Sequence, residues 1–300
     1  MKADGSDTAR DQWAEWILQR RYGGDANRRQ AGLSRLAAIR ERVLDRAGIG
    51  SGSTLLDVGT GDGLIGFGAL DSVGSSGEVI FSDVSGDLLN QCRSLAAELR
   101  DADRCRFIVA GAEELTPVAD GSVDAVTTRA VLIYLRNKPR AFVEFFRVLR
   151  AGGQISLYEP INRLMFPEPR DEFFWGYKIG PVIDLAARLK SVEEGSDCGS
   201  VSTLMDFDER DLFAFASDAG FREIHLELHR EATCVRHPMA WDSFLASSPN
   251  PLAPTNGELI EHSLTKAEQR RLEKHLRPMV ESGERTQRLA EAHLWAQKQG

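Results

Sequence analysis

Several features that mark particular classes of protein are missing from this sequence. Its four cysteines, Cys92, Cys105, Cys198 and Cys234, show no C-x-x-C spacing, so we expect free thiols in a reducing compartment rather than a disulfide framework or a zinc site. No apolar run approaches the roughly 20 residues that cross a bilayer, and the first ten residues lack the apolar segment of a secretion signal. These absences predict a cytoplasmic protein without membrane association.

A surplus of positive charge is also missing. The 300 residues carry 37 basic and 45 acidic side chains, which gives a net charge of −8. General nucleic-acid binders are usually basic, so we expect a small molecule or a peptide as the partner, and the oligomeric state stays open. His225 and His229 share one face of an alternating pattern with no third ligand nearby, so we expect no metal site.

The dinucleotide fingerprint G-x-G-x-x-G is absent, although the pattern of a nucleotide-binding unit is present. Residues 54–58 form a short apolar run typical of a buried strand, glycines alternate through 59–63, and an apolar helical pattern follows. The last glycine of the fingerprint would fall at Leu64. Glycines allow a tight turn and a close approach to a ligand, and Asp83 ends the next apolar run, where a carboxylate can hold a ribose.

Residues 56–63, Leu-Asp-Val-Gly-Thr-Gly-Asp-Gly, resemble the first motif of the class I S-adenosylmethionine-dependent methyltransferases. Two further similarities follow in the family's order, G-A-E-E-L at 111–115 and G-S-V-D-A-V at 121–126. The resemblance implies an α/β fold with a seven-stranded, mostly parallel, doubly wound Rossmann-like sheet, N-terminal helices and helical cap insertions. It also implies S-adenosylmethionine as cofactor and S-adenosylhomocysteine as product.

The resemblance assigns the cofactor to the glycine loop and to the ends of the following strands. The implied cofactor-binding residues are Asp57, Gly59, Thr60, Gly61, Gly63, Asp83, Val84, Leu88, Ala112, Glu113 and Arg129. Gly111 stands where the family commonly has an acidic residue, so backbone contacts from Ala112 and Glu113 are expected instead. Arg129 has two interpretations, a partner for a carboxylate of cofactor or substrate and an ordinary surface arginine.

Composition and the resemblance together divide the chain into six segments. We expect an N-terminal helical cap at 1–50, an S-adenosylmethionine-binding core at 51–160, an aromatic lid insertion at 161–205, the end of the core sheet at 206–240, a second helical insertion at 241–286 and a terminal strand at 287–300. The aromatic insertion has two interpretations, a cover over the acceptor pocket and a second small core. Both can hold together.

The acceptor is the least defined part of the prediction. We expect O- or N-methylation of a small molecule or peptide, and a carboxylate acceptor would need no base. For other acceptors the candidate bases are Tyr134, Glu159 and His237. The candidate substrate contacts are Asn162, Arg163, Trp175 and Tyr177. Two other functions stay open, a nucleotide-dependent Rossmann oxidoreductase and a non-catalytic methyltransferase-like binding protein.

Overall fold

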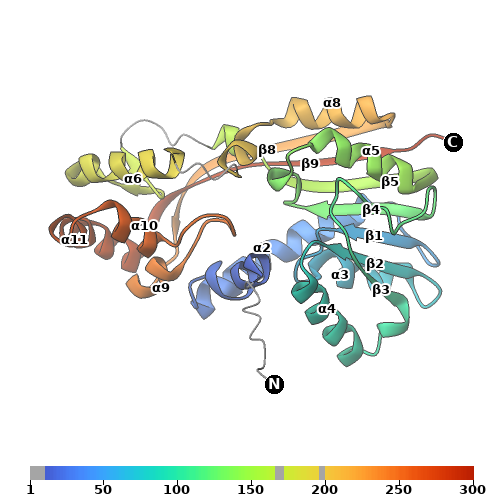
Figure 1. The fold of residues 1–300 in the computed structure, drawn as a ribbon, viewed down its shortest axis with the longest axis horizontal. Coiled ribbons are helices and arrows are strands. Elements are labelled where there is room, and N and C mark those ends of the chain that lie inside the picture. Colours follow the sequence, from blue (N-terminus) through green and yellow to red (C-terminus); the bar gives the residue numbers. More distant parts are fainter. Residues whose placement is uncertain (1–10, 166–171, 196–199) are drawn as a thin grey trace, which may run out of the picture.

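A seven-stranded sheet with the order β3-β2-β1-β4-β5-β9-β8 runs through the computed structural model, which describes residues 11–165, 172–195 and 200–300 (Figure 1). Neighbouring strands are parallel from β3 to β5, and β9 is antiparallel to both β5 and β8. The predicted fold class is confirmed. The strands are β1 (Thr54–Val58), β2 (Glu78–Asp83), β3 (Cys105–Val109), β4 (Val123–Arg129), β5 (Leu149–Pro160), β8 (Arg222–Arg236) and β9 (Glu284–Gln297).

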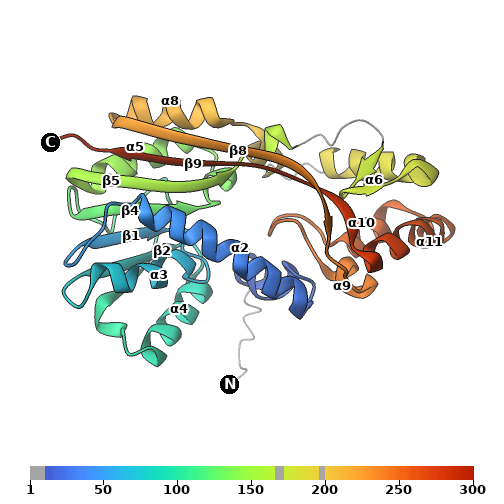
Figure 2. The same cartoon turned by 180° about the vertical axis from the view of Figure 1, so that it is seen from behind.

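Helices cover both faces of the sheet because the strands are apolar on both sides. Leu55 packs with α3 and α4, whereas Leu56 packs with α5 and α8, as the two-residue period of a strand requires. Helix α2 lies beside α3 (Figures 1 and 2). These helices are α2 (Ala26–Asp45), α3 (Leu64–Val73), α4 (Gly86–Glu98), α5 (Lys138–Val148) and α8 (Glu209–Ala219).

The two insertions form one apolar body, which we call the distal lobe and define as residues 172–195 and 238–283. Phe174 and Tyr177 from the first insertion share a buried cluster with Trp241 and Phe244 from the second. The interpretation as a second small core is therefore correct, and Phe166 of the expected aromatic segment lies outside the described residues. The elements of the lobe are β6 (Phe173–Phe174), β7 (Tyr177–Lys178), η5 (Gly180–Val182), α6 (Ile183–Gly195), α9 (Trp241–Ala246), α10 (Asn256–Ser263) and α11 (Lys266–Ser282).

Strands β8 and β9 carry the lobe beyond the sheet (Figures 1 and 2). Pro160, the last residue of β5, pairs with Glu291, which in turn pairs with His229. From there β8 continues to Arg236, and β9 begins at Glu284 rather than at the expected residue 287. The helix before it ends at Gly283, whose φ of 78° is typical of a helix C-cap.

The N-terminal cap consists of α1 (Gln12–Glu15), the π-helix η1 (Trp16–Arg20) and the long α2. The first helical stretch of the cap thus contains a π turn, and Gly23 and Gly24, with φ of 56° and 78°, follow its end. We call residues 11–22 the N-terminal segment. No helix in the described part of the chain is both long and apolar enough to cross a membrane.

Candidate functional site

The glycine loop follows β1, at the edge of the sheet where β1, β2 and β4 end. Gly59 and Gly61 have φ of 64° and 58°, a backbone region that favours glycine. A Cβ atom on Gly59 would lie 2.3 Å from Cγ2 of Val131, and one on Gly61 would lie 3.2 Å from Cδ1 of Ile17. Gly63, with φ of 81°, then starts α3. The predicted strand, glycine loop and helix are confirmed.

Asp57 holds the loop together from inside. Its Oδ2 accepts hydrogen bonds from the Thr60 hydroxyl (2.6 Å) and the Gly66 amide (3.1 Å), and its Oδ1 accepts one from the Thr127 hydroxyl (2.9 Å). Burial raises the pKa of Asp57 to about 6, although these hydrogen bonds favour the charged form. Because Asp57 is 1% exposed and its three hydrogen bonds join the loop, α3 and β4, Asp57 and Thr60 shape the loop rather than lie open to a ligand.

Asp83 joins the end of β2 to the loop. Its Oδ2 accepts the Gly61 amide and its Oδ1 accepts the Ser85 amide, each at 2.9 Å. Burial raises the pKa of this carboxyl group, and the hydrogen bonds from Ser85 and Gly61 oppose the rise. A carboxylate oxygen can accept more than one hydrogen bond, so Asp83 keeps acceptor capacity for a pair of ribose hydroxyls.

Four further residues of the predicted cofactor set differ in exposure. Val84 is 56% exposed and lies beside Gly111, where a Cβ atom would be 3.5 Å from its Cγ1. Ala112 is buried, and the Glu113 carboxylate accepts the Asn137 amide at 2.6 Å, at the start of α5. Leu88 is 1% exposed in α4, so it can support the site from beneath but does not present a surface.

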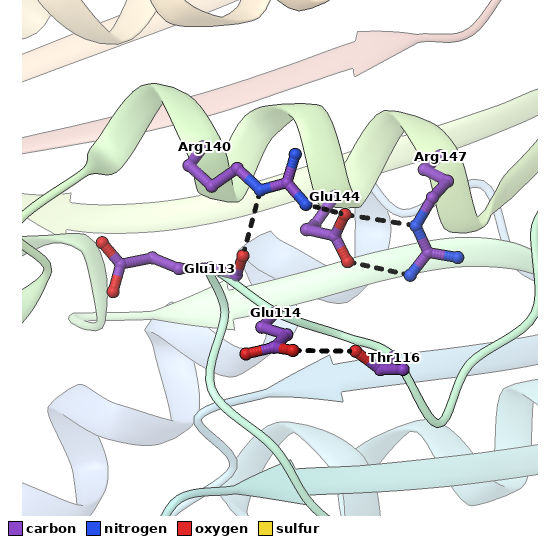
Figure 3. Close-up of a pocket in the computed structure, with 6 residues that line it drawn as sticks. All are labelled: Glu113, Glu114, Thr116, Arg140, Glu144 and Arg147. Atoms are coloured by element: carbon purple, nitrogen blue, oxygen red, sulfur yellow. Dashed lines mark hydrogen bonds and ion pairs between the residues drawn. The ribbon is translucent and has the colours of Figure 1, made fainter.

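A cavity of about 410 Å³ lies beside this turn, lined by Glu113, Glu114, Thr116, Arg140, Glu144 and Arg147 (Figure 3). Both of its arginines pair with Glu144. Glu144 accepts hydrogen bonds from Arg140 (3.0 Å), Arg147 (2.8 Å) and the Leu115 amide (2.8 Å), and the hydrogen bond from Arg147 holds the pKa of Glu144 below its usual value. This cavity is an ion-pair network that fixes the turn, so it is not the reaction site.

Unpaired charges gather on the other side of the glycine loop. Arg129, at the end of β4, and Arg21, at the end of the N-terminal segment, form no ion pair with any described residue. Burial lowers the pKa of Arg21, and the nearby charge of Arg129 lowers it further. Asp62 of the loop also lies near Arg21, and its buried Oδ1 has no hydrogen-bond partner in the described chain. Two guanidinium groups without an ion-pair partner, and one buried carboxylate oxygen without a hydrogen-bond donor, therefore lie beside the loop within the described chain.

Tyr134 and Glu159 do not have the properties of an open base. Glu159 is fully buried, and its carboxylate accepts the amides of residues 131, 132 and 133 at 2.8, 2.9 and 3.4 Å. Burial raises the pKa of Glu159 to about 7, against those three hydrogen bonds. Burial and the charge of Glu159 raise the pKa of Tyr134 above its ordinary value, so its phenol stays protonated at neutral pH and is not available as a phenolate base.

The structure does not bring His237 to this edge. His237 is exposed and follows β8 eight residues after His229, the residue level with the end of β5. At about 3.3 Å per strand residue, that is roughly 25 Å of chain. The Arg163 guanidinium approaches Asp208, the cap of α8, at 3.9 Å, and Asn162 lies in η4 (Asn162–Leu164) directly after β5.

Trp175 and Tyr177 lie in the distal lobe, on either side of Gly176. Trp175 has a φ of 54° and stacks on Phe174 with 4.1 Å between ring centroids, and Tyr177 is 2% exposed. The amide of Thr286 donates to the Gly176 carbonyl at 2.9 Å, which attaches this hairpin to β9. Within the described residues, no group of three His, Cys, Asp or Glu side chains could hold a metal ion.

The sequence argument expected an N-terminal helical cap but assigned none of its residues to the site. Trp13 contacts Tyr134 edge to face at 4.9 Å between ring centroids, and Ile17 reaches Gly61. The Ser85 hydroxyl donates to the Asp11 carboxylate. The helical spacing of Trp13 and Ile17 was the available signal, but the same spacing also fits ordinary packing.

Comparisons with known proteins agree with this geometry. The model of the ubiE/COQ5 methyltransferase family matches residues 33–240. An arsenite methyltransferase of Halobacterium salinarum is 34% identical over 122 residues, which is 41% of this chain and 31% of that protein. A ubiquinone/menaquinone biosynthesis C-methyltransferase UbiE of Cronobacter sakazakii is 28% identical over 186 residues, 61% of this chain and 72% of that protein. The chain thus spans less than a third of the first relative and nearly three quarters of the second.

Solved structures share the fold at lower sequence identity. The YcgJ protein of Bacillus subtilis is 17% identical, with a TM-score of 0.54 over 89% of this chain and 99% of that one. At such identity the likeness concerns the path of the chain. It agrees with the seven-stranded sheet described above.

Proposed function

The chain belongs to the ubiE/COQ5 methyltransferase family, and so to the class I S-adenosylmethionine-dependent methyltransferases, and on this premise we propose that it methylates an organic acceptor at the edge of the sheet. The proposal is carried by the polar groups around the glycine loop that have no partner, or have spare hydrogen-bonding capacity, in the described chain. Asp83 has acceptor capacity for a ribose, Arg21 and Arg129 lack an anion, and Asp62 lacks a donor. A nucleoside attached to a zwitterionic amino acid supplies all three partners.

In this proposal different residues bind different parts of the cofactor. The Asp83 carboxylate accepts from the ribose, and Val84 and Ala112 border the adenine. The guanidinium groups of Arg21 and Arg129 face the amino-acid carboxylate, and Asp62 faces its ammonium group. When bound, S-adenosylmethionine supplies a sulfonium whose methyl group is transferred by in-line displacement, with a neutral thioether as leaving group.

The chemistry required of the protein is then mainly positioning and exclusion of water. Glu159 is fixed by three amides, Tyr134 is protonated, and His237 is remote, so the candidate bases leave no open base at the edge. We therefore propose an acceptor that arrives as a nucleophile, an oxygen or nitrogen that needs no protein base, such as a carboxylate. Two named relatives act on arsenite or, as C-methyltransferases, in quinone biosynthesis, so acceptor chemistry differs within this group.

We also propose a cellular compartment and a type of partner for this protein. The described cysteines, Cys92, Cys105 and Cys234, are free, which supports our proposal of a reducing cytoplasm, while Cys198 lies outside the described residues. A small molecule or peptide remains the proposed partner.

Calorimetric titration with S-adenosylhomocysteine tests the proposal. We expect micromolar binding by the wild-type protein and a loss of at least about 100-fold in Asp83→Ala, since a lost charged hydrogen-bond acceptor for two hydroxyls costs several kcal/mol. Asp87→Ala, an exposed carboxylate in the first turn of α4, is the matched control and should bind normally. No heat and no thermal stabilisation in the wild type, together with stabilisation by a nicotinamide dinucleotide, would overturn the proposal in favour of an oxidoreductase. No response to any of these ligands would point to a protein without cofactor.

A further inference from the structure

A second pair of arginines without a carboxylate partner lies between the N-terminal cap and the distal lobe. Arg28 is in the first turn of α2, and Arg285 is the second residue of β9. Burial lowers the pKa of Arg28, and the largest effect of a neighbouring charge on it comes from Arg285. Tyr177 lies close enough to feel both guanidinium groups. The contacts agree with this: the Arg28 guanidinium lies 3.4 Å from Sδ of Met239, which shares the lobe's buried cluster with Tyr177, and a Cβ atom on Gly176 would lie 3.6 Å from Cβ of Arg285. Three hydrogen-bond donors from α2, β7 and β9 thus lie near one another.

Both arginines are half-buried, and no carboxylate of the described chain pairs with them. In the described chain neither arginine forms an ion pair, and the hydrogen bond recorded for the Arg28 side chain goes to the thioether of Met239 at 3.4 Å, a weak acceptor. The Tyr177 hydroxyl has no hydrogen-bond partner among the described residues, although the residue is 2% exposed. Asp25 is near Arg28, but its carboxylate caps α2 by accepting the Arg28 amide at 2.9 Å.

Another arginine between α2 and β9 does have a carboxylate partner. Arg35, also on α2, pairs with Glu291 of β9 at 2.5 Å and donates to the Tyr158 hydroxyl at 3.3 Å. Burial lowers the pKa of Arg35, but Tyr158 and the Glu291 carboxylate together outweigh burial, so the pKa is raised. Two helical turns earlier on α2, Arg28 has Arg285 rather than a carboxylate beside it, so an anion bound by both guanidinium groups would come from outside the chain.

We propose that Arg28, Arg285 and Tyr177 bind an anionic group of the methyl acceptor, a carboxylate or a phosphate. The inference rests on the proposed function, because it assigns the methyl acceptor to the side of the sheet edge on which the distal lobe lies. Two planar guanidinium groups can each offer a fork of N–H donors to such an oxygen group, and the phenol adds one more donor. The amino-acid carboxylate of the cofactor is a separate anion, assigned to Arg21 and Arg129.

The position of this site also sets the shape of the acceptor. Arg28 precedes Arg35 by seven residues, about 10 Å along a helix. Arg285 precedes Glu291 by six residues, at most about 20 Å along a strand. Tyr158 and Glu291 lie at the end of β5, so the anionic group sits roughly 10–20 Å from the edge where methyl transfer would occur. The acceptor is therefore an elongated molecule with its anionic group at the far end, and an inorganic oxyanion is too small.

Thermal unfolding in the presence of simple anions tests the site directly. Inorganic phosphate and acetate are titrated at constant ionic strength against sodium chloride, and S-adenosylhomocysteine is titrated into the same samples. We expect one of the two anions to raise the midpoint of the wild-type protein saturably, and chloride not to. Saturation at lower phosphate concentration assigns a phosphate-bearing acceptor, and saturation at lower acetate concentration assigns a carboxylate-bearing one.

Three variants and one control complete the test. Arg28→Met and Arg285→Met should each lose most of the anion-dependent rise, and Tyr177→Phe should weaken the anion several-fold. Arg29→Met, an exposed position next to Arg28, should behave as the wild type. S-adenosylhomocysteine binding should stay unchanged in all four. An equal anion effect in Arg28→Met and wild type, or no anion effect in the wild type, overturns the anion site. Absence of S-adenosylhomocysteine binding in the wild type overturns the proposed function instead.

Discussion

The cofactor edge and the distal lobe are built from different kinds of interaction. At the edge, buried carboxylates fix the backbone, as Asp57 does for the glycine loop and Glu159 does for residues 131–133. The lobe has an apolar and aromatic interior around Phe244, and its ion pairs, such as Arg271 with Asp184 at 2.8 Å, are exposed. Buried hydrogen-bonded carboxylates define positions, whereas an apolar core tolerates exchange of side chains. The edge is accordingly suited to hold one fixed ligand, and the lobe to vary with the acceptor.

The largest effect is expected at the glycine loop, from Gly61→Arg. The position has a φ of 58° and Ile17 lies against it, so a long side chain would fill the site that the backbone leaves open. S-adenosylhomocysteine binding should disappear in calorimetry, while the far-ultraviolet circular dichroism stays that of the wild type. Retained binding would show that the ligand does not lie on this loop.

The second effect tests whether the lobe is energetically separate from the edge. Phe244→Ala removes a ring that contacts Trp175, Tyr177 and Trp241, and such truncations cost about 3–5 kcal/mol. We expect an earlier melting transition for the lobe, with S-adenosylhomocysteine affinity within about twofold of wild type. Arg271→Met, which breaks an exposed ion pair of the same lobe, should leave the melting curve unchanged. Loss of cofactor affinity in Phe244→Ala would contradict the separation.

The third effect concerns pH and is confined to the edge. The pKa of Glu159 is raised to about 7 from 4.5 in the unfolded chain, so the folded state binds a proton more readily than the unfolded state over this range. Its contribution to stability is therefore present below about pH 4.5 and is lost as pH rises to 7, by up to about 3 kcal/mol.

Glu159→Gln, which cannot titrate, should flatten the dependence of the unfolding free energy on pH between 4.5 and 7, measured by denaturant titration. Asp57, with its pKa raised to about 6, acts in the same direction, so some slope should remain. An unchanged slope in the variant would show that Glu159 does not titrate in this range.

Local patterns were enough to predict the edge but not the lobe. The glycine loop and Asp83 are specified by short segments whose spacing reflects one β-α-β unit, and the pairing of β1 with β2 confirms it. The core of the lobe joins Tyr177 to Phe244, 67 positions later, and no local period reveals such a contact. Glu159 and His237 show the same limit, because a residue type suggests a base whereas burial and distance decide whether it can act as one.

The unpaired arginines were beyond the reach of sequence reasoning for a related reason. Arg28 and Arg35 look alike in the sequence, and both lie on α2. They differ because β9 presents Glu291 to one and Arg285 to the other. Only the register of a strand that lies about 250 positions later distinguishes a satisfied cation from a free one.

The N-terminal segment belongs to both regions at once. Ile17 lies against Gly61, while the Trp16 indole donates to the Ser248 carbonyl at 3.0 Å and the Gly23 backbone leaves no room for a Cβ atom beside Ser243. Where one element contributes to two sites, the coupling between them is reciprocal. If bound cofactor strengthens the docking of this segment on the lobe by some factor, docking raises the affinity for the cofactor by the same factor. The change of about twofold or less that we expect in Phe244→Ala therefore also limits how much a bound cofactor can strengthen the docking of this segment on the lobe, although Trp16 and Ile17 are neighbours in the chain.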